Sequence, residues 1–185
     1  MPILEVLRHS ERADSSDETS ALTPRGIALA REVARRAPRY ALVVASPAQR
    51  ARQTAQIIGG RVDAIEPELL PDLSRFLKPG ALRELASLEA YAALVAADAN
   101  ARALAERQAA TWAALAVRVP DDAAVLAVSH GGLIELVCAV VLEPLGIALR
   151  GGTFSYCEGP RVRYRDGAPV SLEPLRRSSS SSAAE

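Results

Sequence analysis

The chain has 185 residues, is 49% hydrophobic and balances 22 basic against 22 acidic residues. A chain of this length can bury the core of one domain, and a net charge near zero argues against a general nucleic-acid binder. No apolar stretch reaches the ~18 residues that a membrane span needs, the N-terminus lacks the pattern of a signal peptide, and the two cysteines have no disulfide-framework spacing. We therefore expect a soluble cytosolic protein without a nucleic-acid or membrane partner.

The beginning of the chain predicts a strand, a polar loop and a helix. Residues 3–7 form a short apolar run that is typical of a buried strand, and the polar stretch SERADSSDETSA follows it. Thr23 then provides a helix N-cap, Pro24 fits the first turn because its missing N–H needs no partner there, and Pro38 ends the helix. The role that we expect for Gly26 is a close contact between this helix and the sheet.

The next segment repeats this arrangement. An apolar strand over residues 41–45 runs directly into a helix that we expect Ser46 to cap and Pro47 to begin. The pair Gly59–Gly60 is a typical stop for that helix, and a third strand is predicted over residues 62–65.

The second half of the chain continues the pattern. Residues 80–119 are alanine-rich and predict helices with a break near residues 98–100. Residues 123–129 form a continuous apolar run, which fits a strand that is covered on both faces. A helix through Val141 and a terminal hairpin built from GTFSYCEG and RVRYRDG are predicted to follow.

These elements place the chain in the α/β class. Strands that alternate with helices form a mostly parallel sheet with right-handed crossovers, so we expect a three-layer α/β/α sandwich. We assign residues 1–175 to one domain. The sequence RRSSSSSAAE, residues 176–185, has little to bury and is predicted to be a disordered tail.

Polar side chains gather where three of the predicted strands end. Arg8 and His9 end the first strand. Arg50 lies one helical turn beyond the second strand, and His130 ends the fourth. Ligands of such sheets bind at the carboxyl ends of the strands, so we expect these side chains to meet at one edge. Both histidines of the chain lie there, and histidines with a merely structural role would have no reason to share an edge.

The residue types at this edge favour phosphoryl transfer. Arginine is a planar, permanently charged donor that binds phosphate oxygens in pairs. Its charge also lowers the proton affinity of a neighbouring histidine, which leaves a neutral imidazole nitrogen available as a nucleophile near pH 7. We predict that His9 attacks phosphorus while His130 steadies the oxygens of the transition state. No metal or other cofactor is expected, because arginine supplies the positive charge and the sequence has no cluster of metal-ligand type.

Four short motifs, LRHSER, LTPRG, SPAQRARQTA and AVSHGG, resemble in order and spacing those of the histidine phosphatase superfamily, which has the phosphoglycerate-mutase-like fold. The motifs lie between residues 7 and 132. The resemblance implies that His9 becomes phosphohistidine. It also implies that Arg8, Arg50 and His130 complete the phosphate pocket around it.

The stretch HSERAD also resembles the HxERxD variant of the STS-like branch of this family, which implies that Arg12 is a further phosphate contact. Glu11 and Asp14 either orient Arg12 or only solvate the loop. Ser10 departs from the family pattern, in which glycine is common, and its hydroxyl either reaches phosphate or simply fits there. Thr54 in RQTA is interpreted as core packing.

The general acid that protonates the leaving group is the least defined part of the predicted site. The family usually takes it from a carboxyl after the third strand, and the stretch IEPELLPDLSRF offers Asp72, Glu68 and Glu66. We prefer Asp72 because LPD resembles the family's leucine-x-acid element, although it could equally be an aspartate that only forms a turn. If no carboxyl is placed there, the enzyme favours substrates with good leaving groups, such as phosphohistidine or acyl phosphate.

The function that we predict is hydrolysis of phosphomonoesters through a phosphohistidine on His9. The substrate is a phosphorylated small molecule or a phosphoprotein, and the sequence does not define which, nor the oligomeric state. A phosphoglycerate-type mutase would use the same pocket but must shield the phosphohistidine from water, and the segment 80–100 is short for that purpose. A regulatory protein that binds phosphate without turnover is a third possibility, although all the pocket residues are present.

Overall fold

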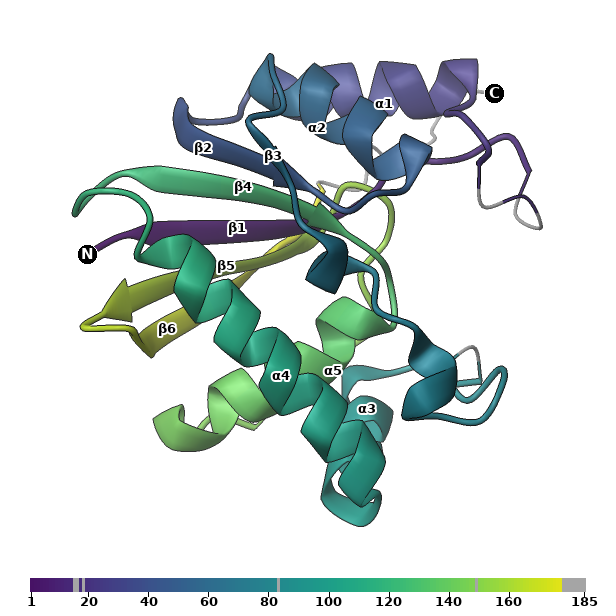
Figure 1. Cartoon of the computed structure of the whole chain (residues 1–185), viewed down its shortest axis with the longest axis vertical. Coiled ribbons are helices and arrows are strands. Elements are labelled where there is room, and N and C mark those ends of the chain that lie inside the picture. The colour runs from purple at the N-terminus through teal and green to yellow at the C-terminus, as the bar shows by residue number, and fades with distance from the viewer. Residues whose placement is uncertain (15–16, 18, 83, 149, 178–185) are drawn as a thin grey trace, which may run out of the picture.

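A mixed sheet forms the centre of the molecule (Figure 1). The structure is a computed structural model that describes residues 1–14, 17, 19–82, 84–148 and 150–177. The strands of the described chain are β1 (Ile3–Arg8), β2 (Tyr40–Ala45), β3 (Ala64–Ile65), β4 (Ala124–Ser129), β5 (Gly159–Arg165) and β6 (Ala168–Leu175). They form one six-stranded sheet in the order β3-β2-β4-β1-β5-β6.

The first four strands along the chain run parallel, as the sequence predicts. β4 pairs in parallel with β1 on one side and with β2 on the other, and β2 pairs in parallel with β3. β5 and β6 are added antiparallel beside β1. The parallel part needs long crossover connections, and helices supply them.

Helices cover both faces of the sheet (Figure 1). They are α1 (Pro24–Ala34), α2 (Gln49–Gly59), α3 (Leu88–Ala97), α4 (Ala99–Ala116) and α5 (Leu133–Leu142), and short 3-10 helices lie at η1 (Pro67–Leu69), η2 (Leu73–Arg75) and η3 (Glu143–Leu145). α1 and α2 lie on one face, whereas α3, α4 and α5 lie on the other. The predicted three-layer α/β/α sandwich is therefore confirmed.

β4 shows why its sequence is continuously apolar. All of its residues are buried, because alternate side chains face opposite helical layers. Leu126 and Val128 join the core beneath α1 and α2. Val125 and Ala127 join the core of the other face, together with Trp112 of α4.

The start of α1 agrees with the sequence prediction, whereas the start of α2 does not. The Thr23 hydroxyl accepts a hydrogen bond from the N–H of Gly26, and Pro24 occupies the first turn. In α2 the N-cap residue is Ala48, which offers no side-chain hydrogen bond. The predicted cap role of Ser46 is therefore wrong, because its hydroxyl is used at the edge of the sheet.

The helical region after residue 80 begins later than the sequence predicts. α3 begins only after Ser87, whose hydroxyl accepts a hydrogen bond from the N–H of Ala90. The segment before it contains Gly80 at a φ of +83°, a left-handed conformation that does not start a helix. The expected break is confirmed, because Asp98 separates α3 from α4 and caps α4.

The terminal hairpin lies further along the chain than predicted. It is formed by β5 and β6, which Asp166 and Gly167 connect with left-handed φ angles of 52° and 77°, typical of a tight hairpin turn. Residues 153–158 form a loop instead of a strand, and Cys157 is left-handed there with a φ of 58°. β3 is also shorter than predicted, because only its two residues pair with β2.

The end of the chain is bound to the domain beyond the predicted boundary. Arg176 and Arg177, which the sequence analysis places in the tail, form ion pairs with Glu158. The rest of the predicted tail, residues 178–185, lies outside the described residues, so the disorder assigned to it stays a prediction. Among the described helices, none has both the length and the apolar character needed to cross a membrane.

Candidate active site

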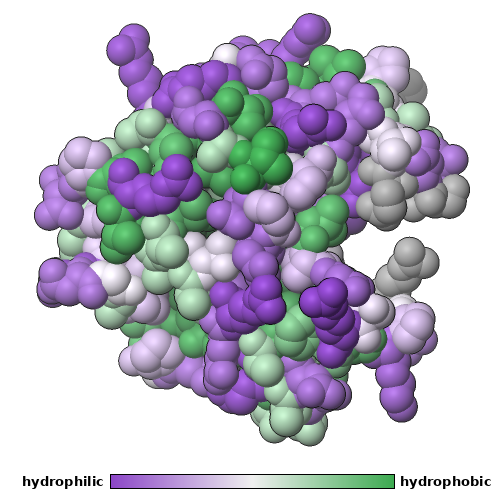
Figure 2. All heavy atoms as spheres, viewed as in Figure 1, coloured by the Kyte–Doolittle hydropathy of each residue, from purple (hydrophilic) through white to green (hydrophobic). Residues whose placement is uncertain are grey.

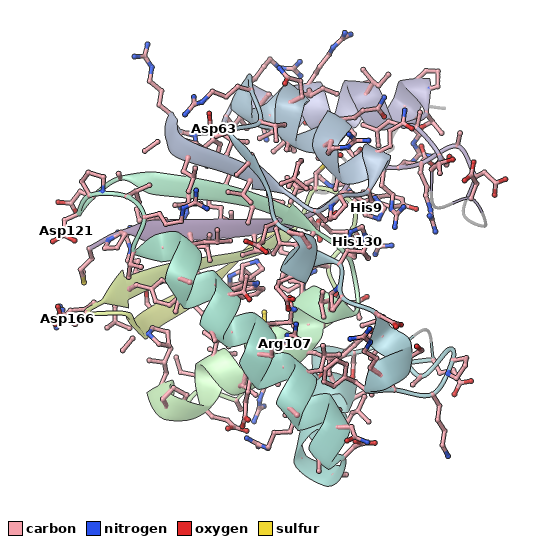
Figure 3. All side chains as sticks on the ribbon, in the orientation of Figure 1. His9, Asp63, Arg107, Asp121, His130 and Asp166 are labelled. Atoms are coloured by element: carbon pink, nitrogen blue, oxygen red, sulfur yellow. The ribbon has the colours of Figure 1, made fainter. Side chains whose placement is uncertain are left out.

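The ends of β1 and β4 bring the two histidines together. In the register of these strands Arg8 lies opposite Ser129. The next residues, His9 and His130, therefore leave adjacent parallel strands at the same edge of the sheet. Their rings are buried with centroids 5.1 Å apart, which confirms the expected meeting of the imidazoles (Figure 3). Figure 2 shows the surface hollowed on the side where these strands end, between the layer of α1 and α2 and the segment that precedes α3.

The hydrogen bonds of His9 define where its proton lies. Nδ1 of His9 is 2.7 Å from the Ser10 carbonyl oxygen, and Nε2 is 3.2 Å from Nε of Arg50. A carbonyl only accepts and a guanidinium only donates, so the neutral ring carries its proton on Nδ1 and a lone pair on Nε2. Burial lowers the pKa of His9 to about 4, against the effect of the Ser10 carbonyl and with help from the charge of Arg50. Nε2 is therefore available as a nucleophile at neutral pH.

His130 is oriented by Ser46, which the sequence analysis assigned to a helix cap. Nε2 of His130 lies 2.8 Å from the Ser46 hydroxyl oxygen, and Nδ1 lies 3.3 Å from Nη2 of Arg50. Because the guanidinium donates to Nδ1, the neutral ring carries its proton on Nε2 and donates it to Ser46. Burial, and then the proximity of His9 and Arg50, lowers the pKa of His130 well below its usual value. The position of Ser46 directly after β2, at the same edge, was the signal for this role.

Arg8 and Arg50 bring permanent positive charge to the two imidazoles. Arg50, in the first turn of α2, is 3% exposed and contacts both rings. Arg8 donates from Nη1 to the Phe154 carbonyl at 2.9 Å, and its Cζ lies 4.7 Å from the ring centroid of Tyr156. The Tyr156 ring centroid is 5.9 Å from that of His9, so Tyr156 forms an aromatic wall beside the nucleophile. Planar charged donors next to neutral imidazoles suit a phosphate dianion.

Gly131 leaves space for the Arg8 side chain. A Cβ on residue 131 would lie 2.9 Å from Nε and 3.0 Å from Cζ of Arg8, so a larger residue would displace the guanidinium. Nε of Arg8 is buried and has no hydrogen-bond partner among the described residues. Gly131, the first glycine of the SHGG motif, therefore leaves the space that the Arg8 guanidinium occupies.

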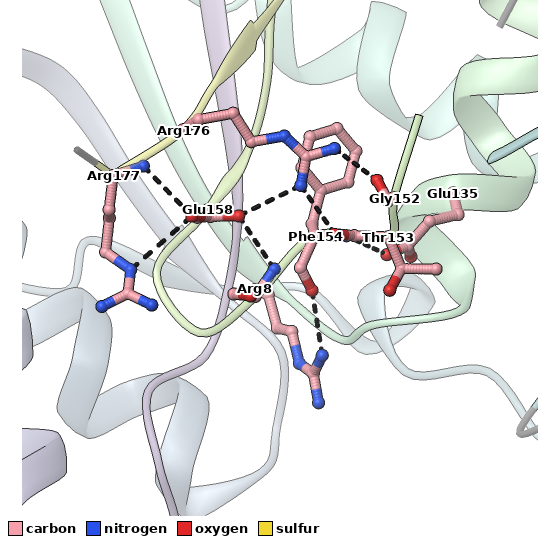
Figure 4. A network of polar contacts seen from close by, with 9 residues as sticks. Arg8, Glu135, Gly152, Thr153, Phe154, Glu158, Arg176 and Arg177 are labelled. Carbon is pink, nitrogen blue, oxygen red and sulfur yellow. Dashed lines mark hydrogen bonds and ion pairs between the residues drawn. The ribbon is translucent and has the colours of Figure 1, made fainter. Parts of the chain in front are cut away.

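Glu135 in the first turn of α5 links Gly132, two residues after His130, to the loop before β5. Its carboxylate is fully buried and accepts hydrogen bonds from the N–H of Gly132 at 2.6 Å and from that of Phe154 at 2.8 Å. The Phe154 carbonyl in turn accepts from Arg8 (Figure 4). Glu135 therefore positions Arg8 through the backbone of Phe154. No sequence pattern indicates this role, because a single acid in an apolar helix gives no sign of the backbone groups that it faces.

Glu158 joins the end of the chain to the same loop (Figure 4). Its Oε2 accepts from the N–H of Ser155 at 3.0 Å and from Nη1 of Arg176 at 3.1 Å, and its Oε1 accepts from the N–H of Arg177 at 3.1 Å. Burial opposes ionisation, yet these donors lower the pKa of Glu158 below its usual value. The backbone carbonyl of Glu158 accepts from the N–H of Arg8 at 2.8 Å. The C-terminal arginines therefore stabilise the loop that holds Arg8.

Ser10 fits the backbone after His9 without left-handed angles, because its φ is not positive. Its N–H donates to the Thr54 hydroxyl at 2.9 Å, and its own hydroxyl donates to the Gly26 carbonyl at 2.7 Å. Thr54 therefore supports the loop of residues 9–14, here called the nucleophile loop, as well as packing in the core. A Cβ on Gly26 would lie 2.3 Å from the carbonyl oxygen of Glu11, so the close contact predicted for Gly26 is with the nucleophile loop and not with the sheet.

Arg12 lies on the nucleophile loop and is partly buried. It donates from Nη1 to the Asp17 carbonyl at 3.3 Å, and its positive charge is among the causes that lower the pKa of both histidines. Glu11 accepts a hydrogen bond from the Thr23 hydroxyl at 2.9 Å, which joins the loop to the start of α1. The contact of Arg12 with phosphate stays a prediction.

Asp72, the preferred general acid, forms the turn that starts η2. Its Oδ1 accepts from the N–H of Ser74 at 3.1 Å and from the Ser74 hydroxyl at 2.6 Å, and its Oδ2 lies 3.3 Å from Nε of Arg75. These contacts, the Ser74 hydroxyl first, lower the pKa of Asp72, which favours the carboxylate over the acid. Asp72 thus has the contacts of the turn-forming aspartate that the sequence left open, and its role as general acid stays a prediction.

The two other candidates for the general acid are also engaged. Glu68 forms a bidentate ion pair with Arg107 of α4, with N–O distances of 2.5 and 2.6 Å, and Glu66 accepts from the N–H of Glu68. Within the described residues, no carboxylate makes a hydrogen bond or ion pair with His9 or His130. The described chain also contains no group of three or more histidine, cysteine, aspartate or glutamate side chains arranged to hold a metal ion.

Solved structures share this fold over nearly the whole chain. Phosphoserine phosphatase from Entamoeba histolytica is 19% identical with a TM-score of 0.68, covering 96% of this chain and 98% of that one. Phosphoglycerate mutase from Bacillus anthracis is 15% identical with a TM-score of 0.66, covering 94% and 92%. Mycobacterial glucosyl-3-phosphoglycerate phosphatase, solved with VO3, is 21% identical with a TM-score of 0.60, covering 88% and 93%. These likenesses confirm the predicted phosphoglycerate-mutase-like fold.

The sequence itself matches a family over most of its length. No curated protein is recognisably similar in sequence. The profile described as Histidine phosphatase superfamily (branch 1) matches residues 5–173, a range that includes both imidazoles and the arginines around them. The STS-like form of the motif stays a prediction. The profile and the fold together establish that this chain belongs to the histidine phosphatase superfamily.

Proposed function

We propose that this protein hydrolyses phosphomonoesters through a phosphohistidine on His9. The observation that carries the proposal is the buried His9 ring, whose proton is held on Nδ1 by the Ser10 carbonyl while the Nε2 lone pair faces Arg50. Such a nitrogen is a competent nucleophile at neutral pH, and the adjacent guanidinium groups can bind phosphoryl oxygens. Membership of the superfamily supports chemistry on phosphate esters in general.

In the first step of the proposed reaction, Nε2 of His9 attacks phosphorus. The N–P bond forms as the P–O bond to the leaving group breaks, and the leaving oxygen keeps the bonding electron pair. Arg8 and Arg50 bind the nonbridging oxygens as charge redistributes among them. When substrate binds, the phosphoryl charge raises the proton affinity of His130, which takes a proton from solvent onto Nδ1, donates it in a hydrogen bond to an oxygen and returns it to solvent when phosphate leaves.

In the second step, water attacks the phosphohistidine. The new O–P bond forms as the N–P bond breaks, and His9 regains its lone pair. One water proton stays with the hydrogen phosphate, and the other passes through solvent to the departed alkoxide or phenolate. The products are therefore an alcohol or phenol and inorganic phosphate.

The engaged carboxylates bear on which leaving groups can depart. Asp72 is bonded to Ser74 and Glu68 to Arg107, and these partners lower the pKa of both carboxyls and so favour their ionised forms. We therefore propose a preference for substrates whose leaving group departs as a stable anion or as a neutral molecule. Such substrates include aryl phosphates, acyl phosphates and phosphohistidine.

The substitution Asp72→Asn tests the general acid. We expect the wild type to hydrolyse p-nitrophenyl phosphate at least about ten-fold faster than glycerol phosphate, and the variant to change either rate by less than about three-fold. Steady-state kinetics on both substrates measures this. A selective loss of about 100-fold or more on glycerol phosphate would instead establish Asp72 as the acid. Asp98→Asn, which alters a helix-capping aspartate of α4, controls for the loss of a cap.

Two measurements test the proposed function itself. Phosphate release is screened across sugar, nucleotide, aryl, peptide and histidine phosphates, with His9→Ala as the inactive control. A radiolabelled substrate, quenched in alkaline denaturant to preserve phosphohistidine, should label the wild type and not the variant. Release without labelling would contradict the intermediate. Phosphate binding with neither release nor labelling would indicate a regulatory protein.

A mutase of the phosphoglycerate type is the second candidate, since a phosphoglycerate mutase shares the fold. It would return the phosphoryl group to a bound product instead of to water. Isomerisation and phosphate release are therefore measured on the same phosphoglycerate. We expect release to be the faster process, and the opposite order would assign the mutase activity.

A further inference from the structure

A groove beside α1 adjoins the wall of the active site. Its volume is about 730 Å³, within the range of small-ligand sites, and its lining includes Tyr156 and Glu11. Tyr156 also faces His9, with 5.9 Å between ring centroids, and Glu11 belongs to the nucleophile loop. Tyr156 therefore borders both the groove and the surroundings of His9.

Basic side chains outnumber acidic ones in the lining of the groove. Its basic side chains are Arg25, Arg31, Arg35 and Arg177, and its acidic side chains are Glu11 and Glu32. Arg25 and Arg31 of α1 and its C-cap residue Arg35 are exposed, and within the part of the chain that the structure describes their guanidinium groups form no ion pair or hydrogen bond. Glu11 and Glu32 can offset two of these charges and Arg177 is ion-paired with Glu158, so one positive charge of the lining stays in excess.

The position of Arg25 adds a second observation. Arg25 is the second residue of α1, and the first turn of that helix contains no acidic residue. Positive charge at a helix N-terminus opposes the helix dipole, and the Glu11 carboxylate, which is bonded to the N-cap residue Thr23, offsets only part of it. An anion in the groove would pair with the exposed arginines beside it.

We propose that this groove binds a second anionic group of the substrate, a carboxylate or a phosphate distinct from the phosphoryl group that reacts at His9. The proposal rests on the proposed phosphatase function and defines its substrate class. Arg25 and Arg35 are roughly 15 Å apart along the helix at a rise of 1.5 Å per residue. The preferred substrates are therefore extended, with the second anion several bonds away from the reacting phosphorus.

Two matched substrate pairs test the proposal. The small-molecule pair is an aryl phosphate that carries a carboxylate at the end of an alkyl chain, and its methyl ester. The peptide pair is a phosphopeptide with acidic residues beside the phosphorylated position, and the same peptide with the corresponding amides. We expect the acidic member of at least one pair to have a kcat/KM about ten-fold higher, and the preference to shrink at high salt. The pair that shows the preference identifies the source of the anion.

Variants of α1 locate the preference in the groove. The double substitution Arg25→Gln with Arg35→Gln should reduce the acidic-to-neutral ratio of kcat/KM to about one. Arg36→Gln is the matched control, because it removes the same charge just beyond the end of α1, where the side chain lines a different cavity. The ratio should be retained in that variant. A wild-type ratio near one for both pairs, or a ratio that the double substitution leaves intact, would overturn the proposal.

A binding measurement separates this proposal from the proposed function. The Kd values of both probe pairs are measured by calorimetry in His9→Ala, with and without the double substitution, so that turnover is not required. Tighter binding of an acidic probe that depends on Arg25 and Arg35 supports the groove even if the wild type hydrolyses nothing. Equal binding within both pairs contradicts it even if the wild type is an active phosphatase.

Discussion

Single residues define the chemistry through the direction of their hydrogen bonds. The partners of His9 place its lone pair on Nε2, whereas those of His130 place its proton on Nε2. Two of these partners, the Ser10 carbonyl and the Ser46 hydroxyl, carry no charge. Arg50 supplies the charge, and it donates to both rings. The two histidines therefore carry their protons on different nitrogens, because Arg50 donates to Nε2 of His9 and to Nδ1 of His130, and the Ser10 carbonyl and the Ser46 hydroxyl accept the protons on the opposite sides of the rings.

Removal of the Ser46 hydroxyl tests this view. In Ser46→Ala the buried Nε2–H of His130 loses its partner, a loss that costs about 1–3 kcal/mol, or roughly ten- to hundred-fold in kcat. Steady-state kinetics on p-nitrophenyl phosphate measures it. Ser129→Ala is the matched control, because that serine is equally buried but donates to the Leu69 carbonyl. It should lose stability but little activity, and equal losses of activity in the two variants would contradict the role of Ser46.

Secondary-structure elements determine which side chains can meet. The pairing of β1 with β4 places the histidines on neighbouring strands, and α2 brings Arg50 back over the same edge. The loop of residues 153–158 contributes the carbonyl that holds Arg8, although it has no regular structure of its own. Its shape is imposed by Glu135 and Glu158, which accept hydrogen bonds from its backbone N–H groups.

The substitution Glu158→Gln tests whether that loop positions Arg8. It keeps the size of the side chain but removes the charge that Arg176 and Arg177 contact, so we expect a loss of about 1–3 kcal/mol in the free energy of unfolding. The KM for p-nitrophenyl phosphate should also rise several-fold. Urea unfolding and kinetics measure the two effects. Glu173→Gln, which weakens a partly exposed ion pair on β6, is the control. A loss of stability with an unchanged KM would show that the loop does not position Arg8 for substrate binding.

The whole molecule encloses both histidines in a buried, positively charged setting, which links folding to pH. In the unfolded chain a histidine takes up a proton near its usual pKa of 6.5, whereas folded His9 does so only near about pH 4, and the pKa of His130 is lowered as well. Between these values the unfolded state binds more protons than the folded state. Stability therefore rises with pH across this window and is lost as pH falls through it.

The expected slope is up to about 1.4 kcal/mol per pH unit for each histidine. Urea unfolding at several pH values between about 4.5 and 7 measures the free energy of unfolding across this window. A variant that combines His9→Ala with His130→Ala should have a distinctly shallower dependence, because the remaining titrating groups are common to both proteins. The same slope in the two proteins would show that the histidines are not the groups responsible.

Local sequence was sufficient for most of the fold and for the centre of the site. Apolar runs, caps and prolines act over a few residues, so the parallel α/β pattern could be predicted from them. The convergence of Arg8, His9, Arg50 and His130 also followed, because the carboxyl ends of parallel strands share one edge. The predicted boundaries of helices and strands were less accurate where the chain forms turns instead, as in the segment before α3 and the loop before β5.

Contacts between distant residues could only be learned from the folded chain. Ser46 follows a strand and precedes a proline, which locally indicates a cap, yet its hydroxyl meets a histidine 84 positions away. Glu135 and Glu158 act on a loop whose path no local pattern defines. The acid candidates show the same limit, since Glu68 is held by Arg107 of a distant helix. A short sequence pattern records what a residue can donate or accept, whereas its partner depends on how the layers pack.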